Sequence, residues 1–419
     1  MGGAVRGRVR ILGADGVFLG RGPVVLRGLV AVDEQGTILE AGEANVVRAA
    51  FPGAPEEWAS GVLMPGLVNA HTHLELSALR GRTHGGRGFV PWVDGMLAAR
   101  GELDDAEAAE GVERGVNELA AAGTVAVGDV SGTLAAVGAL RRAGIMGCIF
   151  HEVFGLDEAR TCARVDALAG EAASLGLLDD SRLAWGPSPH TLHTTHPAAV
   201  RALLRIARAR GARFSVHLAE HAAERAALEV GTGPMVDWLE ARTGTPRERF
   251  RWHAADPFSV AAELGALATD AVLVHLTDAR DAELEAVARA GSHVVLCPRS
   301  NLFIEARLPP VRAMRRIGLE PALGTDSLAS SPSLDVLAEA RALRERFPEV
   351  PAHELLQMAT SHGARALGLE SLGSFACGKR PGVLLVEGAV PTGLDPAAFV
   401  LGQSVAGRRM LFPPGENAR

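Results

Sequence analysis

The sequence predicts an α/β protein: a (β/α)8 barrel joined to a small β-sandwich domain that both ends of the chain form. The chain has 419 residues, which exceeds the roughly 250 residues of a typical barrel and leaves room for a smaller domain. Its middle alternates short apolar runs with stretches of helical period, whereas both ends carry short strand-like segments. We therefore expect residues 63–376 to form the barrel and residues 1–62 and 377–419 to form the sandwich.

The two ends of the chain predict strands because glycine and other turn residues interrupt short β-type patterns there. A helical period appears in the N-terminal part only at Ala44–Phe51. The strand-like segments are Val9–Leu12, Val24–Leu26, Leu29–Val32, Thr37–Ala41, Val383–Val386 and Arg408–Phe412. Segments of this kind at both termini favour one shared β unit.

The middle of the chain contains eight apolar runs, each followed by polar residues and then by a helical stretch. The runs are Gly66–Ala70, Thr124–Val130, Ile145–Phe150, Leu183–Gly186, Arg213–Val216, Ala271–Val274, His293–Leu296 and Glu320–Leu323. The clearest helical stretches are Ala106–Ala122, Pro197–Arg210 and Asp281–Ala290. Alternating strands and helices indicate parallel βαβ units, and eight units indicate a closed barrel. The alternative is an open six-stranded sheet.

The longest intervals follow the first and the fifth apolar runs. We expect the inserted segments there to cover the active site, because barrel enzymes build their sites from the loops that follow the strands.

Polar side chains follow the apolar runs at the positions where barrel strands present active-site groups. Histidine provides only 14 of the 419 residues, yet it marks five of the eight run ends, so a chance distribution is a poor explanation. The residues at the eight run ends are, in order, His71 with His73, Asp129, His151 with Glu152, His190, His217, His275, Cys297–Asn301 and Asp326.

The pair His71 and His73 favours metal binding. Residues two apart on an extended strand point to the same face, so both imidazoles can approach one ion. His217, His275 and Asp326 each end a later run. Any one of them alone is more often a packed core or rim residue, and their joint placement is what favours ligation. Imidazole together with carboxylate suits zinc or ferrous iron better than calcium or magnesium.

Five segments of the chain resemble the amidohydrolase superfamily, in the family's order and over nearly the whole length. They are Pro65–Leu74, His217–Glu220, Cys297–Asn301, Gly324–Ser327 and Gly378–Gly382. The resemblance implies a mononuclear site in which His71, His73, His217 and Asp326 hold one divalent metal ion. It also implies that His275 lies beside the metal-bound water.

The lysine content favours one metal ion rather than two. Binuclear members of this superfamily bridge two ions with a carboxylated lysine on a barrel strand. Lys379 is the only lysine of the chain, and it lies beyond the predicted barrel. We therefore expect one ion per chain, with zinc favoured over iron.

Glu220 follows His217 by three residues, a spacing that resembles the aminohydrolase branch of the family, whose members deaminate nucleobases and nucleosides. The resemblance implies that Glu220 shuttles protons, and deamination of a ring needs one proton at the ring nitrogen and another at the departing ammonia. We expect Glu220, His275 and Asp326 to be catalytic. The alternative for Glu220 is a surface glutamate on the following helix, the position expected for Glu224.

Three residues are candidates for substrate contacts. The resemblance implies that His190 contacts the substrate ring. Glu75 follows the histidine pair and either reaches a sugar hydroxyl or is a rim carboxylate. Trp92 lies in an inserted stretch, as do Trp252 and His253, and aromatic side chains there can close over a base.

The resemblance implies hydrolytic deamination of a 6-aminopurine nucleoside. Within the family the layout is most similar to the 6-aminodeoxyfutalosine deaminases of the futalosine route to menaquinone. The alternatives are deaminases of adenosine, S-adenosylhomocysteine or methylthioadenosine, and a triazine chlorohydrolase. A different class, a catalytically silent barrel scaffold, is disfavoured because such proteins usually lose metal ligands.

Composition excludes several other classes. A net charge of −7 argues against a nucleic-acid partner. No apolar run reaches the roughly 18 residues of a membrane span, and no signal-peptide pattern opens the chain. The four cysteines form no CxxC pair, and Cys148 and Cys297 are expected to be buried thiols. We expect a cytoplasmic protein that binds a small nucleoside, with homo-oligomerisation left open.

Overall fold

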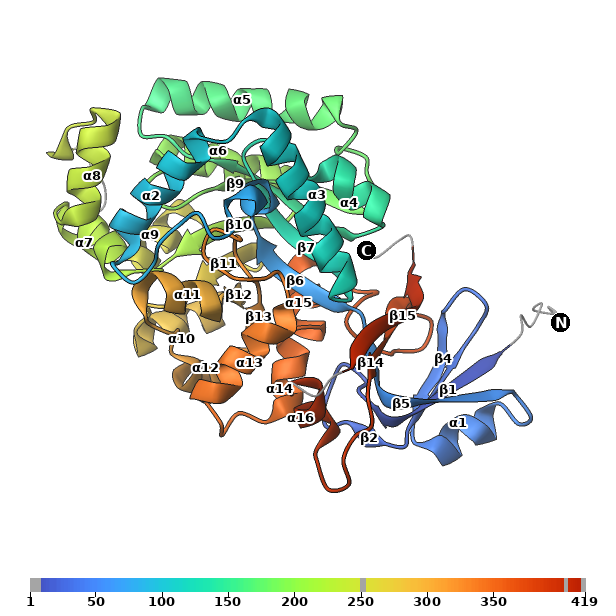
Figure 1. The fold of residues 1–419 in the computed structure, drawn as a ribbon. Coiled ribbons are helices and arrows are strands. Elements are labelled where there is room, and N and C mark those ends of the chain that lie inside the picture. The colour runs from blue at the N-terminus through green and yellow to red at the C-terminus, as the bar shows by residue number, and fades with distance from the viewer. Residues whose placement is uncertain (1–8, 249–253, 403–405, 416–419) are drawn as a thin grey trace.

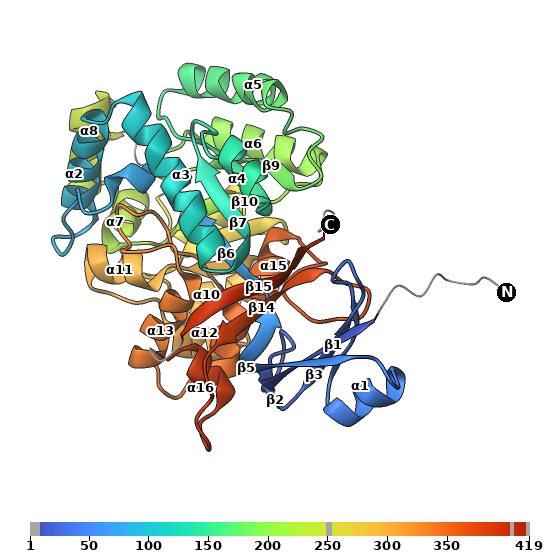
Figure 2. The ribbon, with the colours of Figure 1, turned by 45° about the vertical axis from the view of Figure 1, so that its right-hand side comes forward.

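The computed structural model describes residues 9–248, 254–402 and 406–415. Figure 1 shows a larger α/β part and a smaller β-rich part that contains the first and the last of the described strands. Figure 2 shows the same division after a turn of 45°, with strand β5 leading from the smaller part into β6 of the larger one.

The larger part contains eight parallel strands in two four-stranded sheets, with the orders β6-β7-β8-β9 and β10-β11-β12-β13. The strands are β6 (Leu67–Thr72), β7 (Thr124–Ser131), β8 (Met146–Val153), β9 (Leu183–Pro189), β10 (Phe214–Leu218), β11 (Ala271–His275), β12 (His293–Leu296) and β13 (Ala322–Leu323). Each coincides with one predicted apolar run, so the prediction of eight parallel strands is confirmed and the six-stranded alternative does not fit. Nearly every residue of these strands is buried, as expected for parallel strands covered on both faces.

Single parallel bridges join the two sheets at both seams. Thr72 of β6 pairs with Asp326 just after β13, and Thr191 just after β9 pairs with His217 of β10. The backbone N–H of His217 also donates to the carbonyl of His190 at 3.0 Å. No continuous ladder through all eight strands is present among the described residues. The bridges lie at the carboxyl ends of the strands, where the site residues are.

Helices between the strands cover the outer faces of the two sheets (Figure 1). They are α3 (Asp105–Ala121), α4 (Val137–Ala143), α5 (Glu158–Ser174), α6 (Pro197–Ala209), α9 (Pro257–Leu264), α10 (Asp281–Ala290), α12 (Val311–Ile317), α13 (Val336–Arg346) and α14 (Ala352–Met358). Helix α11 (Pro298–Glu305) packs on α13, and α15 (Ser361–Leu367) packs with Val68, Val272 and Val295 on the other face of the strands. Helix α3 begins with a capping box, in which the Asp104 carboxylate accepts the N–H of Glu107 at 2.8 Å. The three predicted helical stretches correspond to α3, α6 and α10.

The smaller part is one mixed seven-stranded sheet made by both ends of the chain, with the order β15-β14-β5-β1-β3-β4 and β2 paired with β1. Its elements are β1 (Arg10–Val17), β2 (Val25–Leu26), β3 (Leu29–Val32), β4 (Ile38–Gly42), α1 (Ala44–Ala50), β5 (Glu56–Pro65), β14 (Pro381–Glu387), α16 (Pro396–Val400) and β15 (Gly407–Pro414). The predicted terminal strands are confirmed. The predicted sandwich is not confirmed, because all seven strands hydrogen-bond in a single sheet. Strand β5 was not predicted.

The inserted segments after β6 and β10 contact each other. They contain the 3-10 helix η1 (Leu74–Leu79), α2 (Phe89–Gly101), α7 (Ala222–Val230) and α8 (Pro234–Thr243). The indole N–H of Trp238 on α8 donates to Asp94 on α2 at 3.3 Å. Met235 and Val236 of α8 belong to the same apolar cluster as Phe89 at the start of α2. The two insertions therefore form one packed unit.

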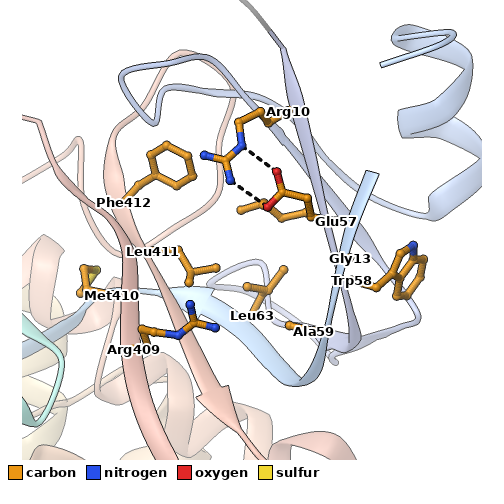
Figure 3. Close-up of a pocket in the computed structure, with 11 residues that line it drawn as sticks. Arg10, Gly13, Glu57, Trp58, Ala59, Leu63, Arg409, Met410, Leu411 and Phe412 are labelled. Carbon is orange, nitrogen blue, oxygen red and sulfur yellow. Dashed lines mark hydrogen bonds and ion pairs between the residues drawn. The ribbon is translucent and has the colours of Figure 1, made fainter. Parts of the chain in front are cut away.

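A cavity of about 280 Å³ lies in the terminal sheet rather than at the carboxyl ends of the parallel strands (Figure 3). Strands β1, β5 and β15 contribute its lining, which includes Leu63 and Phe412. Arg10 donates to both carboxylate oxygens of Glu57, at 3.0 and 2.8 Å. Glu57 is the one carboxylate among the lining residues, so this cavity offers no set of metal ligands. Within the described residues, no helix is both long and apolar enough to cross a bilayer.

Candidate active site

The carboxyl ends of β6, β10, β11 and β13 bring five predicted site residues together. Nε2 of His71 and Nε2 of His73 lie 3.9 and 3.7 Å from Oδ1 of Asp326. Nε2 of His73 lies 3.3 Å from Nε2 of His217. The His275 ring centroid is 5.5 Å from that of His217. The side chains predicted to hold a metal ion therefore converge on one point.

The donor atoms of this cluster fit a divalent metal ion. Both ring nitrogens of His71 are buried and have no hydrogen-bond partner among the described residues, an arrangement that is rare in folded proteins. One ligand atom each from His71, His73 and His217 lies within 4.8 Å of the others. Two nitrogens bound at about 2.1 Å to a tetrahedral zinc ion are about 3.4 Å apart, close to the separation between His73 and His217.

Electrostatics favours the ligand form of these side chains. Burial lowers the pKa of His71 and of His217 well below the usual range, so both imidazoles are neutral at pH 7. Burial by itself would raise the pKa of Asp326, but the neighbouring His73, His275 and His71 lower it to about 2. His71 and His217 therefore present neutral imidazoles, and Asp326 presents a carboxylate.

Hydrogen bonds fix the carboxylate of Asp326. Its Oδ2 accepts from the hydroxyls of Ser300 at 2.5 Å and Ser330 at 3.0 Å, and its Oδ1 accepts from the N–H of Ser327 at 2.7 Å. Asp326 has a φ of 55°, which lies in the left-handed region that few residues other than glycine adopt. Ser300 belongs to a segment that the sequence singled out, whereas nothing in the sequence pointed to Ser330.

Gly324 allows the chain after β13 to approach the first histidine. A Cβ at this position would lie 2.6 Å from Cβ of His71 and 2.7 Å from its carbonyl oxygen. Any side chain there would displace backbone or side-chain atoms of a predicted ligand.

His217 has a defined orientation. Its Nδ1 lies 2.8 Å from the carbonyl oxygen of His190, and since a carbonyl only accepts, Nδ1 carries the hydrogen. Nε2 therefore keeps its lone pair for a metal ion. Glu152 and His190 also lie near His217 as a second possible ligand group. In that second group Nδ1 of His217 cannot bind a metal ion, because it carries the hydrogen donated to His190. Among the described residues, the complete ligand set is therefore the one around Nε2 of His217.

Glu220 lies beside His275, with 3.6 Å between its Oε1 and Nε2 of His275. The carboxyl group is buried, and burial, with Asp326 and Glu224 nearby, raises its pKa well above the ordinary value. The raised pKa favours the protonated carboxyl group of Glu220, which can donate a proton. His275 also contacts Asn301, whose Nδ2 lies 3.1 Å from Nδ1 of the ring.

Glu224 does not lie on the surface, contrary to the prediction. It is 1% exposed, and its two carboxylate oxygens accept the N–H groups of Ala219 at 3.0 Å and Glu220 at 2.9 Å. An acidic residue in the first turn of a helix commonly interacts with the helix dipole in solvent, so the sequence alone did not distinguish this buried position.

The candidates for substrate contacts differ in their surroundings. The ring of His190 is centred 5.0 Å from that of His217, next to the predicted metal ligands. Oε2 of Glu75 accepts hydrogen bonds from Ser131 at 2.9 Å and from Thr133 at 2.6 Å, and Arg100 pairs with Oε1 at 3.3 Å. The carboxylate of Glu75 thus already has several partners within the protein. The predicted sugar contact of Glu75 stays a prediction.

Trp92 is buried on α2, and its indole N–H faces the carbonyl of Ala329 at 3.4 Å. The residue of α2 that reaches the loop carrying Glu220 is Phe89, whose ring stacks on His221 with centroids 4.1 Å apart. Nothing in the sequence pointed to Phe89. Trp252 and His253, which were also considered, lie outside the described residues.

Comparison with known proteins identifies relatives along nearly the whole chain. The amidohydrolase family matches residues 62–407. Over 390 residues the chain is 33% identical to a 5-methylthioadenosine/S-adenosylhomocysteine deaminase of Halobacterium salinarum, with 90% of this chain and 84% of that protein covered. Over 370 residues it is 31% identical to an aminodeoxyfutalosine deaminase of Deinococcus radiodurans, with 86% of each protein covered.

Solved structures share the fold. The aminofutalosine deaminase of Helicobacter pylori, in complex with methylthio-coformycin, superposes with a TM-score of 0.84 at 21% identity, covering 97% of this chain and 100% of that one. An adenosine deaminase of Xanthomonas campestris with bound zinc superposes with a TM-score of 0.73 at 24% identity, covering 98% and 90%. At these identities the likeness establishes the common fold.

Proposed function

Because the chain belongs to the amidohydrolase family, we propose that it is a metal-dependent deaminase that hydrolyses the exocyclic C–N bond of a 6-aminopurine nucleoside. The observation that carries this proposal is the convergence of the predicted metal ligands with a buried glutamic acid, Glu220, at the carboxyl ends of the strands. The scaffold alternative fits poorly, because a silent barrel has no need to retain this set of residues.

We assign the metal ion to His71, His73, His217 and Asp326, one ion per chain. Zinc is the ion we propose, since it suits this ligand set and is present in related solved structures. A divalent ion in such a site supplies the Lewis acidity that makes water a nucleophile at neutral pH. The only lysine, Lys379, bonds to the carbonyl of Glu370 outside the parallel strands, so it is not available to bridge a second ion.

The residues around this site divide the proton transfers between them. Asp326 accepts a proton from the attacking water, and His275 hydrogen-bonds to the same water and holds it against the ring carbon. Glu220 donates its proton to the ring nitrogen next to that carbon, regains a proton from the hydroxyl group added to the carbon, and gives it to the departing amine. The proton held by Asp326 then returns to Glu220, so both carboxyl groups are restored. One C–O bond forms, the C–N bond breaks, and the products are ammonia and the corresponding oxo nucleoside.

Among 6-aminopurine nucleosides we propose 6-aminodeoxyfutalosine as the substrate, which would place the enzyme in the futalosine route to menaquinone. The similarity to the Deinococcus radiodurans aminodeoxyfutalosine deaminase supports this choice. The comparable similarity to the Halobacterium salinarum enzyme favours 5-methylthioadenosine or S-adenosylhomocysteine as the second candidate. His190, Glu75 and Trp92 remain the proposed contacts to the nucleoside.

We also propose that the two parallel sheets are halves of one (β/α)8 barrel. The single bridges from Thr72 to Asp326 and from Thr191 to His217 support closure at both seams. A barrel closed in this way brings the ends of β6 and β13 together, as ligation by His71 and Asp326 requires. The division into residues 63–376 and the two terminal segments is proposed on the same basis.

A screen that measures ammonia release from the nucleosides and chloride release from a triazine tests the substrate. Purified, metal-analysed protein is incubated with 6-aminodeoxyfutalosine, 5-methylthioadenosine, S-adenosylhomocysteine, adenosine and a chlorinated triazine. We expect ammonia from at least one adenine nucleoside, with the highest kcat/KM for 6-aminodeoxyfutalosine. Turnover of the triazine alone by fully metal-loaded protein would reject the proposed reaction.

A further inference from the structure

We infer that Glu224 is a positioning residue that holds the backbone of Glu220 in place for proton transfer. This inference rests on the proposed role of Glu220 and adds a second carboxyl group to the description of the site. Glu224 lies in the first turn of α7, four residues after Glu220, and it touches neither the predicted metal ligands nor the space between them.

The contact is bidentate and involves consecutive backbone amides. Oε1 of Glu224 accepts the N–H of Ala219 at 3.0 Å, and Oε2 accepts the N–H of Glu220 at 2.9 Å. Successive N–H groups that point to one side form a concave site for an anion. Here the anion is the carboxylate of Glu224, four residues after Glu220 in the same segment.

The loop needs such support because its backbone is strained. Ala219 has a φ of 50°, a left-handed conformation that is unfavourable for a residue with a Cβ. The carbonyl of Ala219 accepts the N–H of Asp278 at 2.8 Å on the opposite side of the loop. Two contacts therefore hold Ala219: its carbonyl binds the segment that follows β11, and its N–H binds Glu224.

The surroundings of Glu224 call for a hydrogen-bond acceptor with two oxygens. Glu224 is 1% exposed, and its oxygens meet backbone amides rather than an arginine. A buried carboxylate is unfavourable unless hydrogen bonds compensate for its lost hydration. Burial raises the pKa of Glu224 to about 7, while the amides of Ala219 and Glu220 act in the opposite direction. An apolar side chain would fill the same space but would leave the N–H groups of Ala219 and Glu220 without this acceptor.

The outer side of the loop is covered as well. Nδ1 of His221 accepts the N–H of Glu224 at 3.0 Å and caps α7, and the His221 ring stacks on Phe89 of α2. Glu220 is therefore the member of this turn whose side chain points to the site, where its Oε1 faces His275 at 3.6 Å. Fixing its N–H fixes the direction from which the carboxyl group reaches the reacting atoms.

A double-mutant cycle tests this inference on the metal-loaded enzyme. In Glu224→Gln the side-chain NH2 replaces one acceptor oxygen and meets a backbone N–H. We expect kcat to fall about 10- to 100-fold, since a displacement of roughly 1 Å can have that effect. KM and metal content should stay close to those of the wild type. In the Glu220→Gln background the same change should lower kcat no further than about 2-fold, because both residues act through one step.

Multiplicative losses in the double variant would overturn the inference, and so would wild-type kcat in metal-loaded Glu224→Gln. Glu229→Gln is the matched control, on the same helix but 30% exposed and paired with Arg225. If Glu224→Gln yields no folded protein, Glu224→Asp serves as the second variant. It keeps the carboxylate but shortens the side chain by one methylene, and we expect the same fall in kcat. Full activity in Glu220→Gln would instead reject the proton-transfer role of Glu220, and wild-type enzyme that releases no ammonia from any adenine nucleoside would reject the proposed function, so these failures are distinguishable.

Discussion

The Nδ1–H of His217 donates to the carbonyl of His190 across 2.8 Å, and this contact determines which ring nitrogen faces the metal site. It joins the end of β10 to the segment after β9, at the seam between the two parallel sheets. The same contact that connects the sheets therefore prepares a metal ligand, which links the fold directly to the chemistry.

Loss of a metal ligand should empty the site. His71→Ala removes a ring whose two nitrogens have no other hydrogen-bond partner among the described residues. Elemental analysis of the purified protein should fall from about one transition-metal ion per chain to well below that, with activity lost in parallel. His84→Ala is the control, because His84 is exposed and should leave metal content unchanged. Two tightly bound ions in the wild type would contradict the mononuclear assignment.

Gly324→Ala should weaken metal binding without removing a ligand. The new Cβ would lie 2.6 Å from Cβ of His71, so His71 has to shift, and overpacking of this kind typically destabilises by about 1–3 kcal/mol. We expect faster metal loss to a chelator and a lower melting temperature. Gly95→Ala, on α2 with no atom within 4 Å of its added Cβ, should behave like the wild type. Equal chelator resistance in both variants would show that the approach of β13 to His71 is not critical.

Much of this site was predictable because buried parallel strands end abruptly at polar residues. The apolar runs that end at His71, His217 and Asp326 predicted strands, and a barrel topology places the ends of these strands together. Strand β5 was missed because its partners β1 and β14 come from opposite ends of the chain, and no local pattern records such pairing. The burial of Glu224 was missed because it depends on the left-handed turn at Ala219.

Stability should decline as the pH falls from about 6.5 to 4. Burial, together with the neighbouring Arg164, lowers the pKa of His151 to about 4, and Nδ1 of this ring accepts the indole N–H of Trp185 at 3.2 Å. In the unfolded chain His151 is protonated below about pH 6.5, whereas in the folded chain it stays neutral down to about pH 4. The stability contributed by the neutral ring is therefore fully present above about pH 6.5. It is lost as the pH drops toward 4, by at most about 3 kcal/mol for one group.

Urea unfolding at pH 7.5 and pH 5 measures this dependence. In His151→Gln the difference in free energy of unfolding between the two pH values should be smaller than in the wild type. The same difference in both proteins would mean that His151 does not carry the acid sensitivity and would direct attention to His293, whose pKa burial also lowers to about 4.

The most direct test of the proposed mechanism is the turnover of metal-loaded Glu220→Gln. Glutamine keeps the size of the side chain and its position near His275 but cannot carry a proton, and general acid–base catalysis typically contributes about 10²–10⁴-fold. Because Glu220 serves more than one proton transfer, we expect kcat to fall by about 10⁴-fold or more, with metal content equal to the wild type and Glu229→Gln fully active. Activity in Glu220→Gln comparable to the wild type at equal metal content would contradict the account and shift the proton-transfer role to His275.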